Sequence, residues 1–181
     1  MDHLLQELVQ FVLRIDAMAV DIVVELRRPL FTKVMNSVTG LGSASAGLVF
    51  LGLFYLADWH REFKLTLAAL ILSGVIVGSL MLLVQRPYPP QPVCLTGGAE
   101  TIAHSFPSGH AAAVSVYAMV AHRSKILPFV ITTSAAILIA FSRFYLGTHY
   151  LSDTVFGVLI GIGAVLVAER MFDSDRLPIS Y

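Results

Sequence analysis

The apolar residues of this sequence gather in runs that are separated by short polar segments. Five such runs occupy residues 44–57, 63–84, 108–121, 126–141 and 154–168. The first run is short and can be extended back to about Val38. Several of them approach the ~20 residues that a helix needs to cross the hydrocarbon core of a bilayer. The pattern therefore predicts an all-α fold, a polytopic integral membrane bundle of about six helices with five clear spans.

The segment from residue 4 to residue 28 has a different pattern. Its apolar residues recur at helical spacing, but acidic and basic residues, Asp16 among them, interrupt the apolar face. This pattern is typical of an amphipathic helix in the membrane interface, although a spanning helix stays open. Pro29 ends the segment, because the residue before a proline is pushed out of the α region. We expect one domain, 1–181, with an amphipathic region (1–42), a transmembrane core (43–170) and a polar tail (171–181).

The composition supports a membrane protein and excludes some partners. Hydrophobic residues make up 56% of the chain and charged residues only 13%, against ~25% charged in a typical soluble domain. The formal net charge is zero, so no basic face suggests a nucleic-acid partner. Cys94 is the only cysteine, which excludes an intramolecular disulfide. The expected partners are the bilayer and a substrate, and the sequence leaves the oligomeric state open.

A stretch between the last two apolar runs, residues 142–153, carries three ionisable side chains that suit catalysis. His149 and Asp153 are four residues apart, so they share one face if the segment is helical. A carboxylate beside an imidazole fixes its tautomer and stabilises its charged form. Arg143 adds a planar cation that can bind an oxyanion through two hydrogen bonds. Ionisable groups at a membrane boundary indicate a functional site.

A second polar stretch, residues 107–110, predicts an anion site at the start of a helix. Ser108 is a favourable N-cap, and an apolar helix follows it. The backbone N–H groups of Ser108, Gly109 and His110 would then point at a bound anion, which glycine allows to come close. Arg86, in the preceding loop, would supply a further cation.

Together these stretches predict a pocket for a tetrahedral oxyanion, most obviously phosphate. Two histidines permit a division of labour, in which one attacks phosphorus and the other protonates the leaving oxygen. Asp153 would hold the far ring nitrogen of His149, which marks His149 as the nucleophile and leaves His110 as the acid. No cluster has the spacing of a structural zinc site or of a hard-metal carboxylate site, so neither metal nor cofactor is expected.

The same stretches resemble the signature of the type 2 phosphatidic acid phosphatase (PAP2) superfamily of membrane lipid phosphatases. The family's second motif, Pro-Ser-Gly-His, matches residues 107–110 in full. Its third motif, Ser-Arg, five residues, His, three residues, Asp, matches residues 142–153 in full. The resemblance implies a six-helix membrane fold and metal-independent hydrolysis through a phosphohistidine at His149. It also implies that His110 is the general acid and that phosphate is bound by Arg86, Ser108, Gly109 and Arg143.

One position departs from the family pattern. The first motif is Lys, six residues, Arg-Pro, and alignment on Arg86 and Pro87 places Ser79 where the lysine should be. One charge-assisted contact to phosphate is worth roughly 10² to 10³ in rate if it acts only on the transition state. We therefore expect the missing lysine to weaken the enzyme or retune its substrate, not to abolish its chemistry.

The sequence predicts a phosphatase for a lipid phosphate monoester or diphosphate, such as phosphatidic acid, a phosphatidylglycerol phosphate or its ether-lipid equivalent, or a polyprenyl diphosphate. A lipid phosphotransferase, in which an alcohol other than water takes the phosphoryl group, is one alternative. A non-catalytic binder of lipid phosphates is another, but a binder needs no nucleophile. A vanadium haloperoxidase is disfavoured by the spanning helices and the missing lysine.

The order of the apolar runs predicts on which side of the membrane the site lies. It places all the proposed site residues on one side, together with the N-terminal helix. The other side carries an excess of basic residues, namely Arg61, Lys64, Arg123, Lys125, Arg170 and Arg176. By the positive-inside bias the site then faces away from the cytoplasm of a cell membrane. A C-terminal reporter that proved extracytoplasmic would overturn this assignment.

Overall fold

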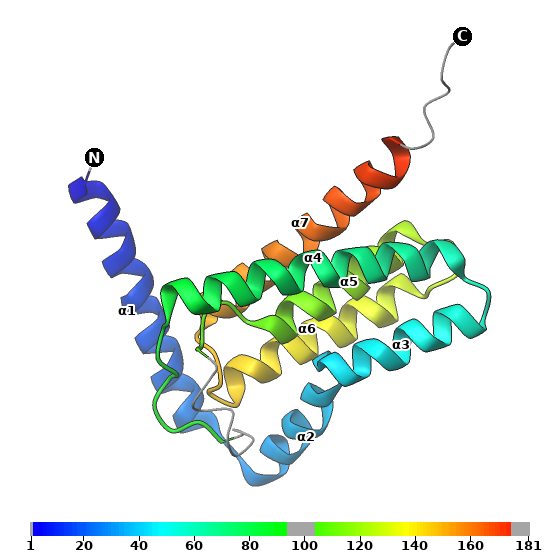
Figure 1. Ribbon diagram of the computed structural model, residues 1–181. Helices are drawn as coiled ribbons and strands as arrows, with labels where there is room; N and C mark the ends of the chain where they lie inside the picture. Colours follow the sequence, from blue (N-terminus) through cyan, green and yellow to red (C-terminus); the bar gives the residue numbers. More distant parts are fainter. Residues whose placement is uncertain (1, 94–103, 175–181) are drawn as a thin grey trace.

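A computed structural model describes residues 2–93 and 104–174, and within them the chain is all-helical (Figure 1). The helices are α1 (Asp2–Leu26), α2 (Pro29–Thr39), the 3-10 helix η1 (Gly40–Gly42), α3 (Ala44–Leu56), α4 (His60–Val84), α5 (Gly109–Arg123), α6 (Phe129–Tyr145) and α7 (Leu151–Ser174). The predicted all-α class is confirmed. Cys94 and the end of the polar tail lie outside the described residues.

Helix α5 is the centre of the bundle and packs against α4, α6 and α7 (Figure 1). The buried side chains of this core are mostly alanine and valine, for example Ala69 on α4, Val116 and Val120 on α5, and Val165 on α7. Small and β-branched side chains let apolar helices approach one another closely. The two helices that begin with the second and third polar motifs are thus held side by side.

Two glycines of α7 explain the close approach of α7 to α5. A side chain at Gly157 would collide with the carbonyl oxygen of Ser108, and one at Gly161 would collide with Ser115 and with the carbonyl oxygen of Ala112. Two small residues four positions apart form a small-xxx-small pair, which lets helices approach closely. The contact occurs within the chain, and it brings the first turn of α7 against the first turn of α5.

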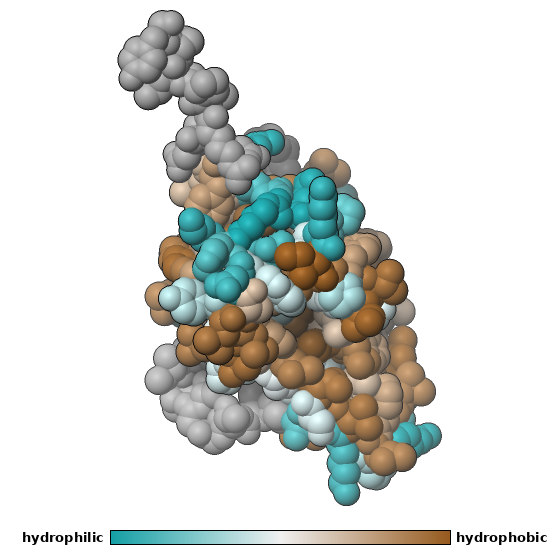
Figure 2. All heavy atoms as spheres, turned by 90° about the vertical axis from the view of Figure 1, so that its right-hand side faces the viewer, coloured by the Kyte–Doolittle hydropathy of each residue, from teal (hydrophilic) through white to brown (hydrophobic). Residues whose placement is uncertain are grey.

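The surface of the bundle is strongly apolar. Leu48, Leu56, Ile71, Val130 and Ile131 are among many large apolar side chains that are exposed. Figure 2 shows one end of the molecule, where polar side chains gather in one zone and apolar side chains cover much of the rest. Apolar surface on this scale is expected where lipid, not water, is the neighbour.

Fewer helices than expected are long enough to span a membrane alone. Within the described residues, α4 and α7 meet the requirements of length and hydropathy, and α2–η1 with α3 form one bent pair that meets them together. Helix α6, with 17 residues, is a shorter apolar helix, and α5 has only 15 residues. Helix α5 belongs to the central packing of the bundle, whereas α6 packs against α5 on one side and exposes Val130, Ile131 and Ile137 on the other.

The polar motifs lie where helices begin and end, which the sequence placed only approximately. Helix α6 continues to Tyr145, so Arg143 belongs to its last turn, and α7 begins at Leu151, so Asp153 belongs to its first turn. Between them Gly147 has a φ of 71°, in the left-handed region that favours glycine. His149 lies in this turn and Asp153 lies in α7, so the condition under which the two would share one helix face is not met.

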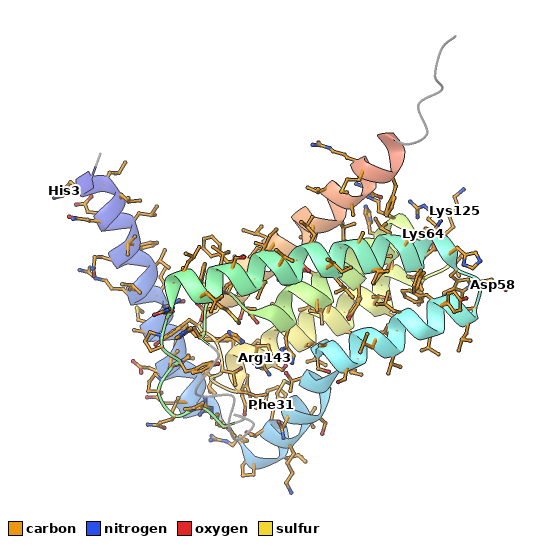
Figure 3. All side chains as sticks on the ribbon, viewed as in Figure 1. His3, Phe31, Asp58, Lys64, Lys125 and Arg143 are labelled. Atoms are coloured by element: carbon orange, nitrogen blue, oxygen red, sulfur yellow. The ribbon has the colours of Figure 1, made fainter. Side chains whose placement is uncertain are left out.

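The charged side chains divide between the two ends of the bundle. Asp58, Lys64 and Lys125 lie at one end, and Arg143 lies toward the other (Figure 3). At the first end the guanidinium of Arg61 donates to the carbonyl of Arg123. The motif residues described next are at the second end, together with α1 and α2.

Candidate active site

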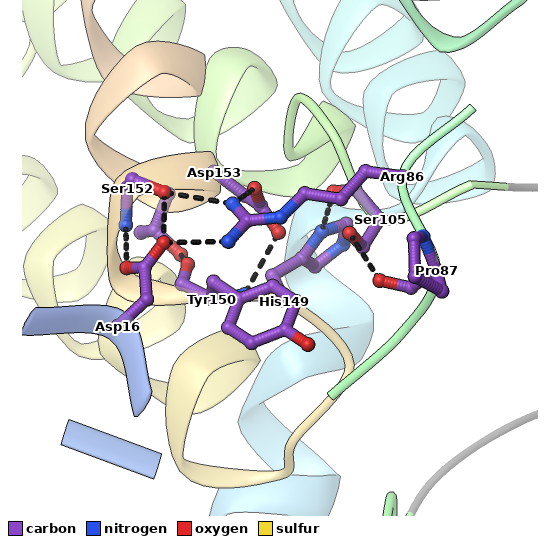
Figure 4. A network of polar contacts seen from close by, with 9 residues as sticks. Asp16, Arg86, Pro87, Ser105, His149, Tyr150, Ser152 and Asp153 are labelled. Atoms are coloured by element: carbon purple, nitrogen blue, oxygen red, sulfur yellow. Dashed lines mark hydrogen bonds and ion pairs between the residues drawn. The ribbon is translucent and has the colours of Figure 1, made fainter. Parts of the chain in front are cut away.

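Arg86 is the centre of a polar network that joins three separate parts of the chain (Figure 4). Its Nη1 donates to Asp153 at 2.5 Å and to the hydroxyl of Ser152 at 2.8 Å. Its Nη2 donates to Asp16 at 2.7 Å. The guanidinium also lies 3.8 Å from the centroid of the Tyr150 ring. The loop after α4, helix α1 and the first turn of α7 therefore meet at one cation.

His149 is held by a backbone carbonyl. Its Nδ1 lies 2.6 Å from the carbonyl oxygen of Ser105, and because a carbonyl only accepts, Nδ1 carries the proton. The lone pair is then on Nε2. The sequence assigned this orienting task to Asp153, and that detail is wrong: Asp153 binds Arg86 and accepts the backbone N–H of Tyr150 at 2.8 Å.

Ser105 connects the first motif to this histidine. Its backbone N–H donates to the carbonyl of Arg86 at 2.8 Å, and its hydroxyl donates to the carbonyl of Pro87 at 2.9 Å. The carbonyl that orients His149 is thereby fixed to the loop that carries Arg86. Sequence reasoning missed Ser105, since a serine next to a proline-rich loop carries no signal of such a role.

The electrostatic setting of His149 keeps its ring neutral. The side chain is only 5% exposed, and burial, reinforced by the positive charge of Arg143 and more weakly by His110, lowers its pKa to about 3. A neutral imidazole at pH 7 has a free lone pair on Nε2. The dependence on Arg143 and His110 also means that these two side chains lie near His149.

The second motif forms the expected N-terminus of α5. Ser108 is fully buried, and its hydroxyl accepts the N–H of Ala111 at 3.4 Å. Its own N–H donates to the carbonyl of Asp153 at 3.0 Å, so the expectation that this N–H points at an anion is wrong. Within the described residues no hydrogen bond uses the N–H groups of Gly109 and His110, and these two remain directed out of the helix end.

Arg143 approaches the same region from the end of α6. Its Nη1 donates to the hydroxyl of Thr39, at the end of α2, at 2.9 Å. Thr39 is buried, so this bond ties the bent α2–η1 segment to the guanidinium. The structure thus brings the predicted residues Arg86, Asp153 and His149 together around one polar network, with Arg143 and His110 beside His149.

An elongated apolar cavity of about 540 Å³ begins at the N-terminus of α5. Gly109 and His110 line one end of it, Gly47 and Tyr117 line it farther along, and α3, α4 and α5 form its walls. From His110 to Tyr117 the helix rises ~10 Å. A side chain at Gly42 would lie 3.1 Å from the ring of His110, so this glycine leaves room for the imidazole at the cavity end.

The chemistry of the arrangement suits a phosphoryl group. Within residues 2–93 and 104–174 there is no group of three histidine, cysteine, aspartate or glutamate side chains that could hold a metal ion. The site instead offers guanidinium groups, a helix N-terminus and a neutral imidazole, which together suit a phosphoryl group and a nucleophile.

Comparison with known families decides the membership. The model of the PAP2 superfamily matches residues 63–176, which include all three motifs. The chain belongs to the PAP2 superfamily. It is an enzyme, a membrane phosphatase of this superfamily, as the resemblance implied.

Individual relatives agree with this membership. The decaprenylphosphoryl-5-phosphoribose phosphatase of Mycobacterium tuberculosis is 31% identical over 121 residues, 66% of this chain and 67% of the relative. The crystal structure of Aquifex aeolicus LpxE matches with a TM-score of 0.73 and 26% identity, over 83% of this chain and 92% of that one. A PAP2-type phosphatidylglycerolphosphate phosphatase from Bacillus subtilis shares the fold, with a TM-score of 0.72 and 22% identity over 96% and 98% of the two chains.

The departure at Ser79 is visible in the structure. Ser79 lies in the last two turns of α4 and is exposed. Within the described part of the chain, the side-chain hydrogen-bond partners of Arg86 are Asp16, Ser152 and Asp153, and Ser79 is not among them. Asp16 and Asp153 thus pair with one guanidinium, and the lysine of the family motif is absent from this chain.

Proposed function

We propose that this chain is an integral membrane lipid phosphatase that hydrolyses a lipid phosphate monoester or diphosphate through a phosphohistidine. Nε2 of His149 attacks phosphorus, the bond from phosphorus to the leaving oxygen breaks, and His110 gives that oxygen a proton. Water then attacks the phosphohistidine, loses a proton to His110, and releases inorganic phosphate. The cycle returns both histidines to their starting protonation states.

The observation that carries this proposal is the hydrogen bond between Nδ1 of His149 and the Ser105 carbonyl. It selects the tautomer with a lone pair on Nε2, and the lowered pKa keeps that lone pair available at pH 7. A preorganised, neutral imidazole beside a guanidinium is what nucleophilic attack on an anionic phosphoryl group requires.

The remaining site residues have the tasks of binding and alignment. We infer that Arg86, Arg143 and the N–H groups of Gly109 and His110 form the phosphate-binding region, while Ser108 is the cap that fixes the helix end. Asp153 holds Arg86 and the backbone before α7. Charge-assisted hydrogen bonds of this kind stabilise the equatorial oxygens as phosphorus becomes five-coordinate.

The apolar cavity favours a lipid as the leaving group. A chain bound along α3, α4 and α5 would end at His110, which lines the cavity mouth. The oxygen that leaves phosphorus would then lie next to the proposed acid. In phosphatidic acid and a phosphatidylglycerol phosphate this oxygen belongs to a lipid alcohol, and in a polyprenyl diphosphate it is the bridging oxygen that leaves with the polyprenyl phosphate, so each leaving group carries the lipid chain. The names of two relatives refer to lipids of the second kind and to a decaprenylphosphoryl sugar phosphate.

We also infer that the site lies on the extracytoplasmic side of a cell membrane. The bundle end opposite the network carries Arg61, Lys64, Arg123 and Lys125, and Figure 3 shows Lys64 and Lys125 there. Basic residues are favoured on the cytoplasmic side of a membrane.

The deciding experiment is phosphate release by the detergent-purified chain from phosphatidic acid, phosphatidylglycerol phosphate and undecaprenyl diphosphate, with EDTA present throughout. We expect release from at least one lipid and no loss on addition of EDTA, because the proposed mechanism uses no metal. Folded protein that releases phosphate from none of them would contradict the proposal. Activity that disappears with EDTA and returns with a divalent cation would contradict the metal-independent mechanism.

Filling the cavity should separate lipid binding from phosphoryl transfer. Gly74 on α4 lines the cavity, and a side chain added there meets no atom within 4 Å. We expect Gly74→Leu to lower kcat/KM for a long-chain lipid phosphate by about tenfold, on the scale of ~1.4 kcal/mol for lost apolar contact, and to leave p-nitrophenyl phosphate hydrolysis unchanged. Gly52→Leu is the matched control, since Gly52 is also open but does not line the cavity. An equal loss on both substrates would argue against the cavity as the chain site.

A further inference from the structure

Asp16 is the one acidic residue of α1 that is buried within the described part of that helix. Its side chain is 1% exposed, whereas Glu7, Asp21 and Glu25 are exposed. A buried carboxylate is costly unless hydrogen bonds and an opposite charge compensate for its lost hydration. Its partners therefore indicate why this amphipathic helix carries an aspartate on its inner face.

Each hydrogen bond of Asp16 goes to a residue adjoining the proposed catalytic machinery. Oδ2 accepts Nη2 of Arg86 at 2.7 Å and the hydroxyl of Ser152 at 2.5 Å. Oδ1 accepts the backbone N–H of Ser152 at 2.9 Å. Because Ser152 is the second residue of α7, Asp16 caps the helix whose first turn carries Asp153 (Figure 4).

The contacts leave a definite part of Arg86 available. Both hydrogens of Nη1 are taken by Ser152 and Asp153, and one hydrogen of Nη2 is taken by Asp16. Of the five N–H groups of an arginine, the described residues thus use three. The N–H at Nε and the second one at Nη2 lie on one edge of the guanidinium, which is the pair that binds two oxygens of a phosphate.

We propose that Asp16 is a positioning residue, which fixes the guanidinium of Arg86 so that its Nε–Nη2 edge is presented to the phosphoryl group. This inference rests on the proposed function, in which Arg86 binds phosphate. Asp153 alone would hold Nη1 and leave the guanidinium free to pivot about that contact. With Asp16 on Nη2 the plane of the group is defined at two points from two different helices.

The role reaches beyond attachment of α1 to the bundle. A residue that only tied α1 down would need the bonds to Ser152 and no contact with a phosphate-binding cation. The N-terminal amphipathic helix, which also packs through Val20 and Val23 against Phe144, Tyr145 and Leu146, completes the site, so its docking and the alignment of Arg86 are one event.

The test is a double-mutant cycle between Asp16 and Arg86 in the full-length, detergent-purified chain. It measures kcat/KM for whichever lipid of the phosphatase panel is hydrolysed fastest. We expect Asp16→Ala to lower kcat/KM by about tenfold to a hundredfold when Arg86 is present, in the range for coupled residues of one network. In the Arg86→Ala background the same change should cost less than twofold. A purely structural role of Asp16 would not produce this dependence on Arg86.

Two further variants guard against loss of folding. Asp16→Asn keeps an acceptor for the Ser152 N–H but removes the charge opposite Arg86, so we expect it to fold and still to lose activity in the same direction. Asp21→Asn, on the exposed face of α1, should retain wild-type activity, and thermal unfolding should show that every variant is folded at the assay temperature.

The outcomes separate the two proposals. If Asp16→Ala costs the same factor in both backgrounds, or if Asp16→Asn is as active as wild type, the positioning role is overturned while the phosphatase proposal stands. If Arg86→Ala is fully active, or if the wild type releases no phosphate from any lipid, the proposed function of the site falls and this inference falls with it.

Discussion

Replacing His149 by alanine is expected to reduce phosphate release by about 10⁴-fold or more, because no other group can take the place of a covalent nucleophile. The ring is buried, its Nδ1 proton is held by Ser105, and its pKa is lowered to about 3. Two parts of the chain, the loop residues Arg86 and Ser105 and the turn before α7, therefore fix the orientation of this imidazole. The measurement is initial rate on the most active lipid, with EDTA present.

The matched control is His60→Ala. His60 is exposed and begins α4 at the opposite end of the bundle, so its loss should leave the rate unchanged. A second readout is the intermediate itself. Wild type quenched during turnover of a phosphorus-labelled substrate should carry acid-labile, base-stable label, as expected of a phosphoramidate, and His149→Ala should carry none. A variant that still releases phosphate at near the wild-type rate would show that another residue is the nucleophile.

The helical membrane fold could be predicted because apolar runs of this length have few other solutions. In a bilayer the backbone must satisfy its own hydrogen bonds, so a run such as 63–84 has to be a helix. The exact ends of the helices were harder to predict. Helix α4 begins earlier, at His60, and its nearby Glu62 is buried and accepts the hydroxyl of Ser124. The apolar run began only at residue 63, because the sequence near Glu62 gives no sign of a partner about sixty residues away.

The residues of the site were identifiable, but their partners were not. The two complete motifs pointed to His110, His149 and Arg143 because each chemistry needs that residue type at that spacing. Asp16 meets Ser152 across 136 positions of sequence, and only the packing of α1 onto α7 reveals it. The sole signal in the sequence was that Asp16 interrupts an apolar face. An exposed aspartate would have given the same signal.

The sequence predicted that Asp153 orients His149, but in the structure the Ser105 carbonyl does so and Asp153 binds Arg86. This difference has a physical reason. Asp153 is fully buried and lies beside Arg86, and a buried carboxylate gains more from a guanidinium than from a neutral ring. The backbone carbonyl of Ser105 fixes the tautomer of His149 without placing a second negative charge next to it. The hydrogen bond to this carbonyl raises the pKa of His149, but burial and the charge of Arg143 outweigh it and lower the pKa to about 3, so the nucleophile stays uncharged.

Replacing His110 by alanine should have the second largest effect, and its size should depend on the leaving group. An alkoxide from a lipid alcohol is a poor leaving group and needs a proton, so we expect a loss of about 10²- to 10⁴-fold on a lipid phosphate monoester. The p-nitrophenolate ion leaves without protonation, so p-nitrophenyl phosphate should lose far less in the phosphorylation step. The measurement is the single-turnover rate at which each substrate phosphorylates His149. This step precedes the attack of water, so the role of His110 in activating water does not affect it.

The position of His110 supports its assignment as the acid that protonates the leaving oxygen. It lines the end of the apolar cavity, so the oxygen of a chain bound there is next to His110, while His149 is on the side of Ser105 and Arg143. His122→Ala, in the last turn of the same helix and exposed, is the matched control and should phosphorylate at the wild-type rate on both substrates. Equal losses on both substrates in His110→Ala would mean that His110 binds phosphate instead of protonating the leaving oxygen, and the roles of the two histidines would have to be assigned again.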